Sequence, residues 1–173
     1  MQSSNAKGGV YIKTAICPGS FDPITNGHLS IIRQASKIFD KVIVLILNNP
    51  EKNPMFSVKK RLYWIYSSTS TLSNVSAKYW DKLLVDYLAL TKACAIVKGV
   101  RSWNDFNYEM QMAAINKSLN PKAQTVFLPA SFENMHITSS LVKHIYGLGG
   151  NIESFVPKEI LIDLKKTMGE AKI

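Results

Sequence analysis

The stretch PGSFDPITNGH, residues 18–28, holds the first side chains of this sequence that could do chemistry. It follows an apolar segment with strand character, and Thr25 or Asn26 can cap a helix whose first turn carries His28. Ser20 offers a hydroxyl at the end of the strand, so both groups are expected to face the positive end of a helix. This pattern predicts a phosphate pocket. The alternative is that His28 only caps the helix and Ser20 only stabilises a turn.

Two cations and a carboxylate follow another candidate strand, AIVKGV (95–100). Lys98 and Arg101 flank Gly99, which suits a point charge and a fork-shaped donor directed at phosphate oxygens. Glu109, on the next expected helix, is either a ligand of a ribose or base or an ordinary exposed carboxylate. This strand end therefore predicts a second group of phosphate contacts.

Two more strand ends carry donors. Lys52 lies between two prolines, whose fixed dihedrals stiffen its loop, although a solvated lysine is the ordinary interpretation. Thr138, Ser139 and Ser140 stand where a helix is expected to begin after the fifth strand. Plain N-capping explains one of these hydroxyls, and three in a row favour an uncharged anion cradle.

The elements that must position these residues alternate between β-rich and helical patterns. The run VIVLIL (42–47) is apolar at every position, as expected for a strand covered on both faces of a parallel sheet. The segment from Thr25 to Phe39 has apolar residues at helical spacing. The expected strands are 10–17, 41–47, 75–80, 95–100 and 124–129, and the expected helices are 25–39, 57–68, 83–92, 105–119, 138–146 and one starting near 157.

This alternation predicts an α/β fold, namely a single doubly wound Rossmann-like domain with a five-stranded parallel sheet and a C-terminal helical extension. Residues 1–10 are expected to form a flexible N-terminal tail, and residues 11–173 the single folded domain. In such a sheet, ligands bind beyond the carboxyl ends of the strands. The four loops are therefore expected to meet around one space suited to a polyphosphate.

The residue set favours transfer between phosphates. The sequence has no Ser-His-Asp order with a nucleophile elbow, no poised pair of carboxylates and no Walker loop. A covalent intermediate is therefore unnecessary, and catalysis would depend on positioning and charge neutralisation. Asp22 is the only carboxylate of the first loop, so no metal ligand is expected from the protein, and Mg²⁺ would arrive with the nucleotide.

Composition narrows the class of protein further. The 173 residues are 46% apolar, which suits one globular domain, and no apolar run reaches the ~18 residues of a membrane span. The net charge of +9 favours anionic partners, but the cations are scattered, so RNA binding is allowed and not required. The start lacks the apolar centre of a signal peptide, and two cysteines without ligand spacing favour the reducing cytoplasm. Cys94 is expected to be buried, and Cys17, beside the first loop, could touch a ligand.

Taken together, the motifs resemble a known family. PGSFDPITNGH is the long form of the T-x-G-H signature of nucleotidyltransferases. NPEKNPMF, LLVDY, VKGVRSWNDFNYEMQMA and ITSSLVK follow in the order and spacing of the bacterial phosphopantetheine adenylyltransferase family. The short T-x-G-H element alone is shared with cytidylyltransferases and nicotinate mononucleotide adenylyltransferases, so the combination carries the resemblance. It implies an enzyme that moves AMP from ATP to 4′-phosphopantetheine, giving dephospho-coenzyme A and pyrophosphate.

The resemblance implies roles position by position. His28 would stabilise the transition state, with Lys52 and Arg101 as further catalytic residues. It implies Mg²⁺ with ATP, a homohexamer, and feedback by coenzyme A, with neither nucleic acid nor a membrane as partner. ATP contacts are implied for Ser20, Phe21, His28, Gly99, Val100, Arg101, Glu109, Asn134, Met135, His136, Ile137, Thr138, Ser139 and Ser140, and phosphopantetheine contacts for Ser20, Lys52, Leu84 and Lys98.

The sequence departs from the family at three of these positions. Lys98 stands where Arg is common, Thr138 where Ser is common, and Asn134 at a position that is often aromatic. Two rival interpretations remain: an adenylyltransferase acting on another phosphate, such as nicotinate mononucleotide, and a basic RNA-binding module with the same fold. The Lys52 loop and Leu84 argue against the first rival, and the intact catalytic set argues against the second.

Overall fold

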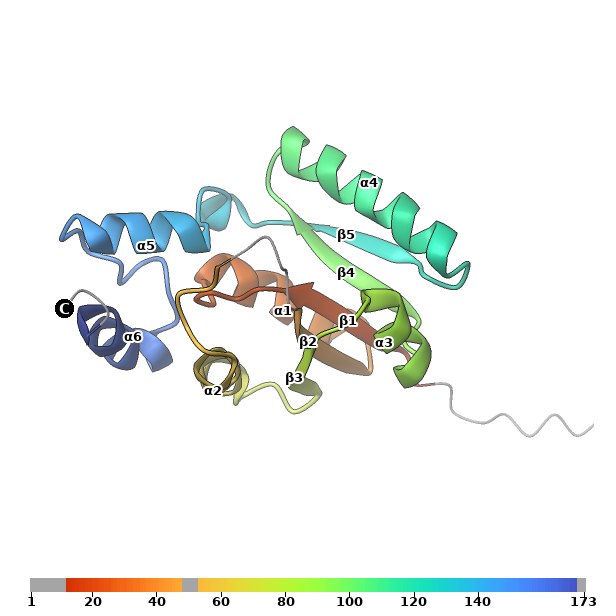
Figure 1. Ribbon diagram of the computed structural model, residues 1–173, viewed down its shortest axis with the longest axis horizontal. Coiled ribbons are helices and arrows are strands. Elements are labelled where there is room, and N and C mark those ends of the chain that lie inside the picture. The colour runs from red at the N-terminus through yellow and green to blue at the C-terminus, as the bar shows by residue number, and fades with distance from the viewer. Residues whose placement is uncertain (1–11, 48–52, 171–173) are drawn as a thin grey trace, which may run out of the picture.

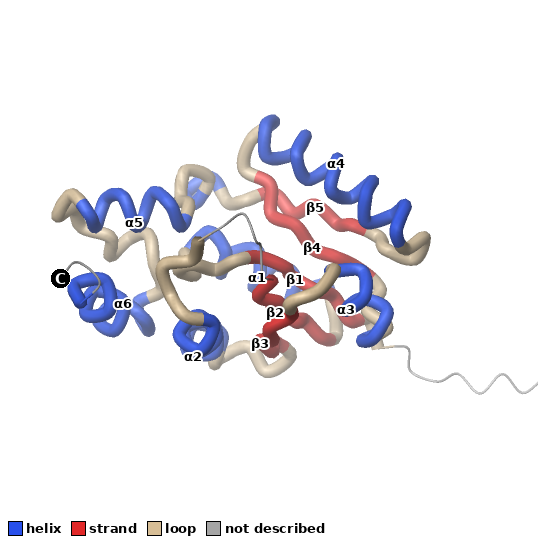
Figure 2. Tube along the Cα trace, viewed as in Figure 1, coloured by secondary structure: helices blue, strands red, loops and turns tan. Residues whose placement is uncertain are grey.

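The computed structural model describes residues 12–47 and 53–170, so the expected tail (1–10) and Lys52 lie outside the described residues. Strands and helices alternate along the chain (Figure 2). The strands are β1 (Thr14–Gly19), β2 (Lys41–Leu47), β3 (Val75–Trp80), β4 (Ala95–Val100) and β5 (Thr125–Pro129). The helices are α1 (Asn26–Ile38), α2 (Val58–Thr69), α3 (Leu84–Thr91), α4 (Trp103–Leu119), α5 (Ser139–Gly147) and α6 (Lys158–Glu170), with a 3₁₀ turn η1 (Phe132–Asn134).

The five strands form one parallel sheet in the order β3-β2-β1-β4-β5 (Figure 1). The chain first winds outward from β1 to β3 and then crosses to β4 on the other side of β1. This reversal of winding leaves a crevice at the carboxyl ends of β1 and β4, where open α/β sheets bind ligands. The predicted α/β fold with a five-stranded parallel sheet is confirmed.

Helices cover both faces of the sheet because the central strands are apolar on both sides. In β2, Val44 and Ile46 pack in one cluster with Ile32 of α1 and Trp64 of α2. The intervening Leu45 packs on the opposite face, in a cluster with residues of α3. The unbroken apolar run of β2 therefore has the two-sided burial that the sequence predicts.

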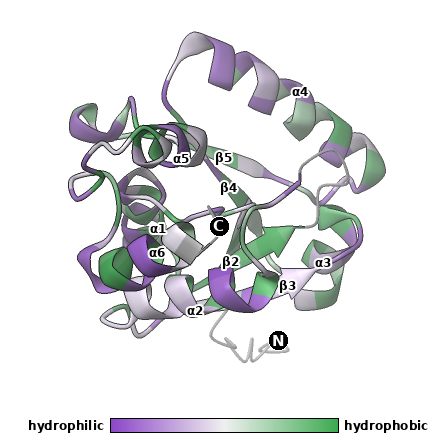
Figure 3. Ribbon diagram, turned by 60° about the vertical axis from the view of Figure 1, so that its left-hand side comes forward, coloured by the Kyte–Doolittle hydropathy of each residue, from purple (hydrophilic) through white to green (hydrophobic). Residues whose placement is uncertain are grey.

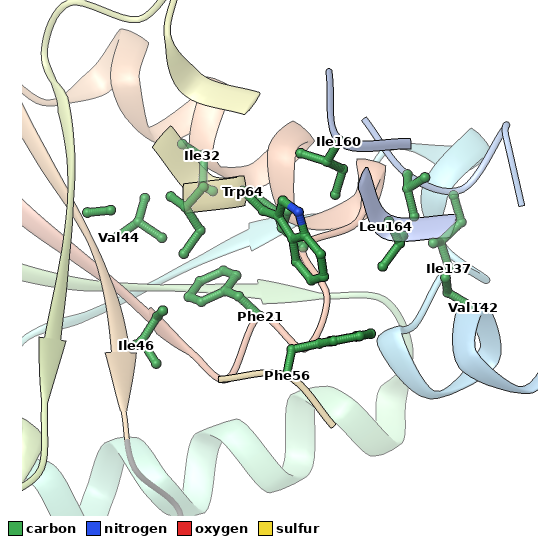
Figure 4. Packing of buried hydrophobic residues seen from close by; sticks show 14 of the residues in the cluster. Phe21, Ile32, Val44, Ile46, Phe56, Trp64, Ile137, Val142, Ile160 and Leu164 are labelled. Carbon is green, nitrogen blue, oxygen red and sulfur yellow. The ribbon is translucent and has the colours of Figure 1, made fainter. Parts of the chain in front are cut away.

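The C-terminal helices extend the core beyond the end of the sheet. Val142 of α5 and Ile160 and Leu164 of α6 are fully buried and join the cluster around Trp64 (Figure 4). Both helices lie at the same end of the molecule as the start of α1 (Figure 1). The predicted C-terminal helical extension thus braces the loop that follows β1.

Three details differ from the sequence-based expectation. β1 continues to Gly19, beyond the expected end at Cys17, because β2 stays apolar and pairs with it up to Gly19↔Ile46. α4 begins at Trp103, two residues early, because the Ser102 side chain accepts a hydrogen bond from the Asp105 N–H and caps the helix there. Cys94 is only partly buried. In the described part of the chain, no helix is long and apolar enough to cross a membrane.

Candidate active site

A cavity of about 450 Å³ opens at the carboxyl ends of β1 and β4. Its walls come from five places: the β1–α1 loop, the first turn of α1, the end of β4, the start of α4, and the start of α5. Loops that are far apart in the sequence therefore meet at one edge of the sheet, because the carboxyl ends of parallel strands lie there. The predicted site residues on its walls are Ser20, Phe21, His28, Lys98, Gly99, Arg101, Glu109, Ile137, Thr138, Ser139 and Ser140.

His28 is held in the cavity wall by the capping box of α1. The Thr25 N–H donates to His28 Nδ1 at 3.1 Å, and the Thr25 hydroxyl oxygen lies 2.9 Å from the same nitrogen. In return, Thr25 Oγ1 accepts from the His28 N–H at 3.3 Å. Because Nδ1 accepts a hydrogen bond, the proton of the neutral ring sits on Nε2. His28 therefore caps the helix through Nδ1, as the alternative interpretation of the sequence expected, while Nε2–H stays available as a donor.

The surroundings keep this ring neutral. Burial is the largest cause, and together with the nearby positive charges of Arg101 and then Lys98 it lowers the pKa of His28 from 6.5 to about 4. The ring of Phe21 meets the imidazole edge to face, with centroids 5.1 Å apart. At neutral pH, His28 is therefore an oriented, uncharged N–H donor in a cationic cavity.

Two cations that the described residues place in the cavity wall are paired with carboxylates of α4. Lys98 Nζ lies 3.0 Å from Glu109 Oε1. Arg101 Nε donates to Asp105 Oδ2 at 2.8 Å, and its Nη1 donates to the Ile137 carbonyl at 3.2 Å. Glu109 is thus not the ordinary exposed carboxylate of the alternative interpretation. Two carboxylates of α4 thus balance the two positive charges of Lys98 and Arg101 in the cavity wall.

The three hydroxyl residues at the start of α5 have different surroundings. Thr138 caps the helix, accepting from the Leu141 N–H at 2.9 Å. Ser139 Oγ donates to the Pro23 carbonyl at 2.8 Å and so ties α5 to the β1–α1 loop. Ser140 is exposed on the cavity wall. Two of the three hydroxyls of the predicted cradle are therefore already bonded within the fold.

Other predicted site residues lie elsewhere. Asn134 and His136 line a second, more open hollow of about 830 Å³ on the outer side of α1, and Met135 is exposed beside them. Leu84, in the first turn of α3, packs against the cluster around Leu45, away from the walls of the first cavity. Val100, the last residue of β4, accepts the Ala130 N–H at 2.9 Å.

Of three further residues that line the cavity, Asp105 was not assigned from the sequence, whereas Gly99 was a predicted site residue and Cys17 a possible ligand contact. Asp105 binds Arg101, and its spacing of four residues after Arg101 is the signal that could have found it. Gly99 allows close approach, since a Cβ there would lie 2.7 Å from Ile31 Cγ1 of α1. Cys17 also lines the cavity, where burial raises the pKa of its thiol to about 12, so it stays protonated. Among residues 12–47 and 53–170, no group of three or more His, Cys, Asp or Glu side chains is placed to hold a metal ion.

Comparison with known proteins agrees with this geometry. The model of the cytidylyltransferase-like family matches residues 16–145. A solved structure of a bifunctional NMN adenylyltransferase/ADP ribose pyrophosphatase from Francisella tularensis superposes with a TM-score of 0.69 at 19% identity, over 92% of this chain and half of that one. This likeness establishes the fold. Fold and site together define a nucleotidyltransferase, and the chain belongs to the cytidylyltransferase-like family.

Two full-length relatives narrow the family further. The phosphopantetheine adenylyltransferase of Clostridium botulinum (strain 657 / Type Ba4) is 45% identical over 161 residues, which is 93% of this chain and 98% of the relative. That of Caldanaerobacter subterraneus subsp. tengcongensis is 47% identical over 146 residues, 84% of this chain and 91% of the relative. The chain is an adenylyltransferase of the phosphopantetheine adenylyltransferase family, as the sequence motifs indicated.

Proposed function

We propose that the enzyme moves AMP from ATP to 4′-phosphopantetheine, producing dephospho-coenzyme A and pyrophosphate for coenzyme A biosynthesis. A phosphate oxygen of phosphopantetheine would form a bond to the α-phosphorus of ATP while the bond to the β-phosphate bridging oxygen breaks. The observation that supports this reaction most is the 45% identity to an adenylyltransferase of that name across nearly the whole chain. The cavity adds a donor and two cations around one polyphosphate-sized space.

His28 would act on the transition state as a neutral donor. Its Nδ1 is engaged by Thr25, so Nε2–H is the group available to a non-bridging oxygen of the α-phosphate. In the transition state, the α-phosphorus lies between the attacking and the leaving oxygen, and the distribution of negative charge over its equatorial oxygens changes. A fixed hydrogen-bond donor beside these oxygens stabilises the transition state. No proton transfer by His28 is needed. The attack would therefore be direct and in line, without a covalent enzyme intermediate.

The cations would neutralise the rest of the phosphate charge. We assign Arg101 to the triphosphate and Lys98 to the acceptor phosphate, each exchanging its α4 carboxylate for phosphate oxygens. Lys52 and Leu84 keep their predicted roles on the acceptor side. The described residues place no group of three or more His, Cys, Asp or Glu side chains where it could hold a metal ion, so Mg²⁺ would enter as part of the substrate Mg–ATP.

The test is pyrophosphate release from Mg–ATP with three additions: phosphopantetheine, nicotinate mononucleotide, or no acceptor. Release with phosphopantetheine alone supports the proposal. Release with nicotinate mononucleotide would assign the enzyme to a different acceptor. Absence of release in all three, together with salt-dependent binding of RNA, would replace the proposal by an RNA-binding role for the cationic surface.

We also propose a homohexamer, supported by the exposed apolar residues of α4. Trp103, Tyr108 and Leu119 are between 56% and 71% exposed, and α4 runs along the outer edge of the molecule with apolar and polar stretches (Figure 3). Large exposed apolar side chains gathered on one helix mark an association surface. Sedimentation of the wild type and of Leu119→Glu tests this, since a charge there should shift the protein toward smaller species.

Feedback by coenzyme A and a cytoplasmic location complete the proposal. Coenzyme A shares the pantetheine and nucleotide parts of the product, so it would compete for the same cavity. Pyrophosphate release measured at rising coenzyme A concentrations tests the competition. The cysteines Cys17 and Cys94 are both free thiols, which fits a reducing compartment.

A further inference from the structure

Two buried charged side chains, Asp22 and Arg61, hold the segment that carries Ser20 and Phe21. Each is only 5% exposed. Asp22 belongs to the β1–α1 loop, and Arg61 to the first turn of α2. Charged groups are seldom buried to this extent without a full set of partners, because leaving water is costly. Their partners therefore show what the fold gains from them.

The contacts of both side chains converge on one backbone. Asp22 accepts from the Met55 N–H and the Phe56 N–H, both at 3.0 Å, and from Lys143 Nζ at 2.7 Å. Arg61 donates from Nε to the Phe56 carbonyl at 3.0 Å and from Nη1 to the Ser20 carbonyl at 2.7 Å. The backbone of Phe56 is thus bound at its N–H by one side chain and at its carbonyl by the other. We call Asp22 and Arg61 the clamp.

The clamp acts on a segment with an unusual backbone. Phe21 has a φ of +47°, in the left-handed region that residues with a side chain rarely adopt. Such a conformation persists only where the surroundings determine it from several sides. Arg61 bonds the carbonyl of the residue before Phe21, the residue after it is Asp22, and Phe21 and Phe56 lie in the same apolar cluster (Figure 4). This arrangement fixes the Phe21 ring, which in turn contacts His28 edge to face.

We propose that Asp22 and Arg61 are positioning residues for the transfer reaction, setting the Ser20 hydroxyl and, through Phe21, the imidazole of His28 relative to α2 and α5. This inference rests on the proposed function. The hydrogen bonds of the clamp reach the Ser20 carbonyl, the segment before α2, and Lys143 of α5, so the clamp orders the half of the cavity that carries His28. A shift of about 1 Å at this level is enough to lower turnover about 100-fold when reaction depends on geometry.

The experiment compares Arg61→Lys and Asp22→Asn with a matched control, Asp163→Asn. Lysine keeps the charge but lacks the fork that reaches two carbonyls, and asparagine keeps the shape but has one acceptor oxygen in place of two. Asp163 accepts from Lys60 Nζ at 2.8 Å and Trp64 Nε1 at 2.6 Å, so it also ties α2 to a neighbouring helix, but it does not line the cavity. kcat and KM are measured by pyrophosphate release, ATP affinity by calorimetry, and the three His rings by NMR.

Each clamp variant should lower kcat about 10- to 100-fold while the Kd for ATP changes less than about threefold. The His28 ring resonances, identified with His28→Ala, should shift in both clamp variants because Phe21 moves, and should stay in place in Asp163→Asn. Unchanged kcat and unchanged His28 resonances in the clamp variants would overturn the proposal. Equal losses of kcat in Asp163→Asn, or failure of both clamp variants to fold, would assign the clamp to stability alone and overturn it as well.

The two proposals fail in different ways. If the wild type releases no pyrophosphate with phosphopantetheine, the proposed function fails, whereas the NMR comparison still tests whether the clamp sets the His28 ring. If the wild type is active and the clamp variants match it in kcat and in the His28 resonances, only the clamp proposal fails.

Discussion

The two walls of the cavity are built on helices that differ in how they are held. α1 and α4 both follow a strand of the sheet, and both begin with a side-chain cap, Thr25 and Ser102. α1 has five buried residues, namely Gly27, Leu29, Ile31, Ile32 and Ala35. α4 is longer, and in the described structure none of its residues is buried. One wall is part of the core, and the other rests on its outside.

This difference separates two ways of placing a functional group. His28 takes its position from packing and from its cap, neither of which a ligand can easily displace. Lys98 and Arg101 are held by carboxylates of α4, and such partly exposed ion pairs contribute little energy and exchange readily for phosphate. The cavity therefore combines a rigid donor with adaptable charges, which suits a reaction in which phosphates enter and leave at each turnover.

Removing the donor of the rigid wall should have the largest effect. His28→Ala is expected to lower kcat about 100- to 1,000-fold, or about 3 to 4 kcal/mol of barrier, because α1 is too well packed to bring another group into place. ATP affinity should change much less, since the donor acts mainly on the transition state. Pyrophosphate release and calorimetry measure the two quantities. A kcat within threefold of the wild type would remove His28 from this role.

Matched isoleucines on the two walls test the packing itself. Ile32 of α1 is 1% exposed and Ile115 of α4 is 49% exposed. Ile32→Ala should lower the free energy of unfolding by about 3 kcal/mol through lost burial and a new cavity. Ile115→Ala should change it by less than about 0.5 kcal/mol at protein concentrations too low for association. Urea unfolding of both variants makes the comparison, and equal losses would show that α4 is anchored as firmly as α1.

The sequence was enough to predict much of this architecture. Strands 41–47, 75–80 and 95–100 match β2, β3 and β4 at both ends, and the nearly continuous apolar run of 41–47 is the strongest of these signals. The site followed from topology, since parallel strands end at one edge and the loops after β1, β4 and β5 all reach the cavity. Motif spacing then indicated the family, which the relatives confirm.

The features that the sequence did not predict depend on contacts between distant segments of the chain. Asp22 meets Phe56 across 34 positions and Lys143 across 121, and no periodic pattern marks such partners. Arg61 reads as one more surface cation of a basic helix, yet it is buried beneath the cavity loop. Asn134 lies in the second hollow because the η1 turn directs it to the outer side of α1, which the linear motif does not show.

The pH dependence of stability offers a smaller test of the rigid wall. The pKa of His28 is about 4 in the folded protein and near 6.5 when unfolded, so the unfolded state binds more protons between these values. Stability is therefore complete above pH 6.5 and falls as the pH drops toward 4. Between pH 7 and pH 5, the shifted pKa of His28 should lower the free energy of unfolding by about 1 to 2 kcal/mol.

Glutamine is the control at this position, because it can occupy the third position of a capping box without titrating. The difference in unfolding free energy between the wild type and His28→Gln should narrow or reverse in favour of the variant as the pH falls from 7 to 5. Urea denaturation at both pH values measures it. A constant difference would mean that the imidazole is not kept neutral by its surroundings.

The two helix caps give the smallest effect and the finest comparison. Thr25→Ala and Ser102→Ala should each lower the free energy of unfolding by about 1 kcal/mol, because each removes an acceptor for an N–H of the first turn. Their effects on turnover should differ. The Thr25 hydroxyl also lies 2.9 Å from His28 Nδ1, so its loss should lower kcat, and Thr25→Ser should restore it. Ser102→Ala should leave kcat within twofold, since Arg101 keeps its bonds to Asp105. Equal kcat values for the two alanine variants would show that the cap supports the helix without orienting the ring.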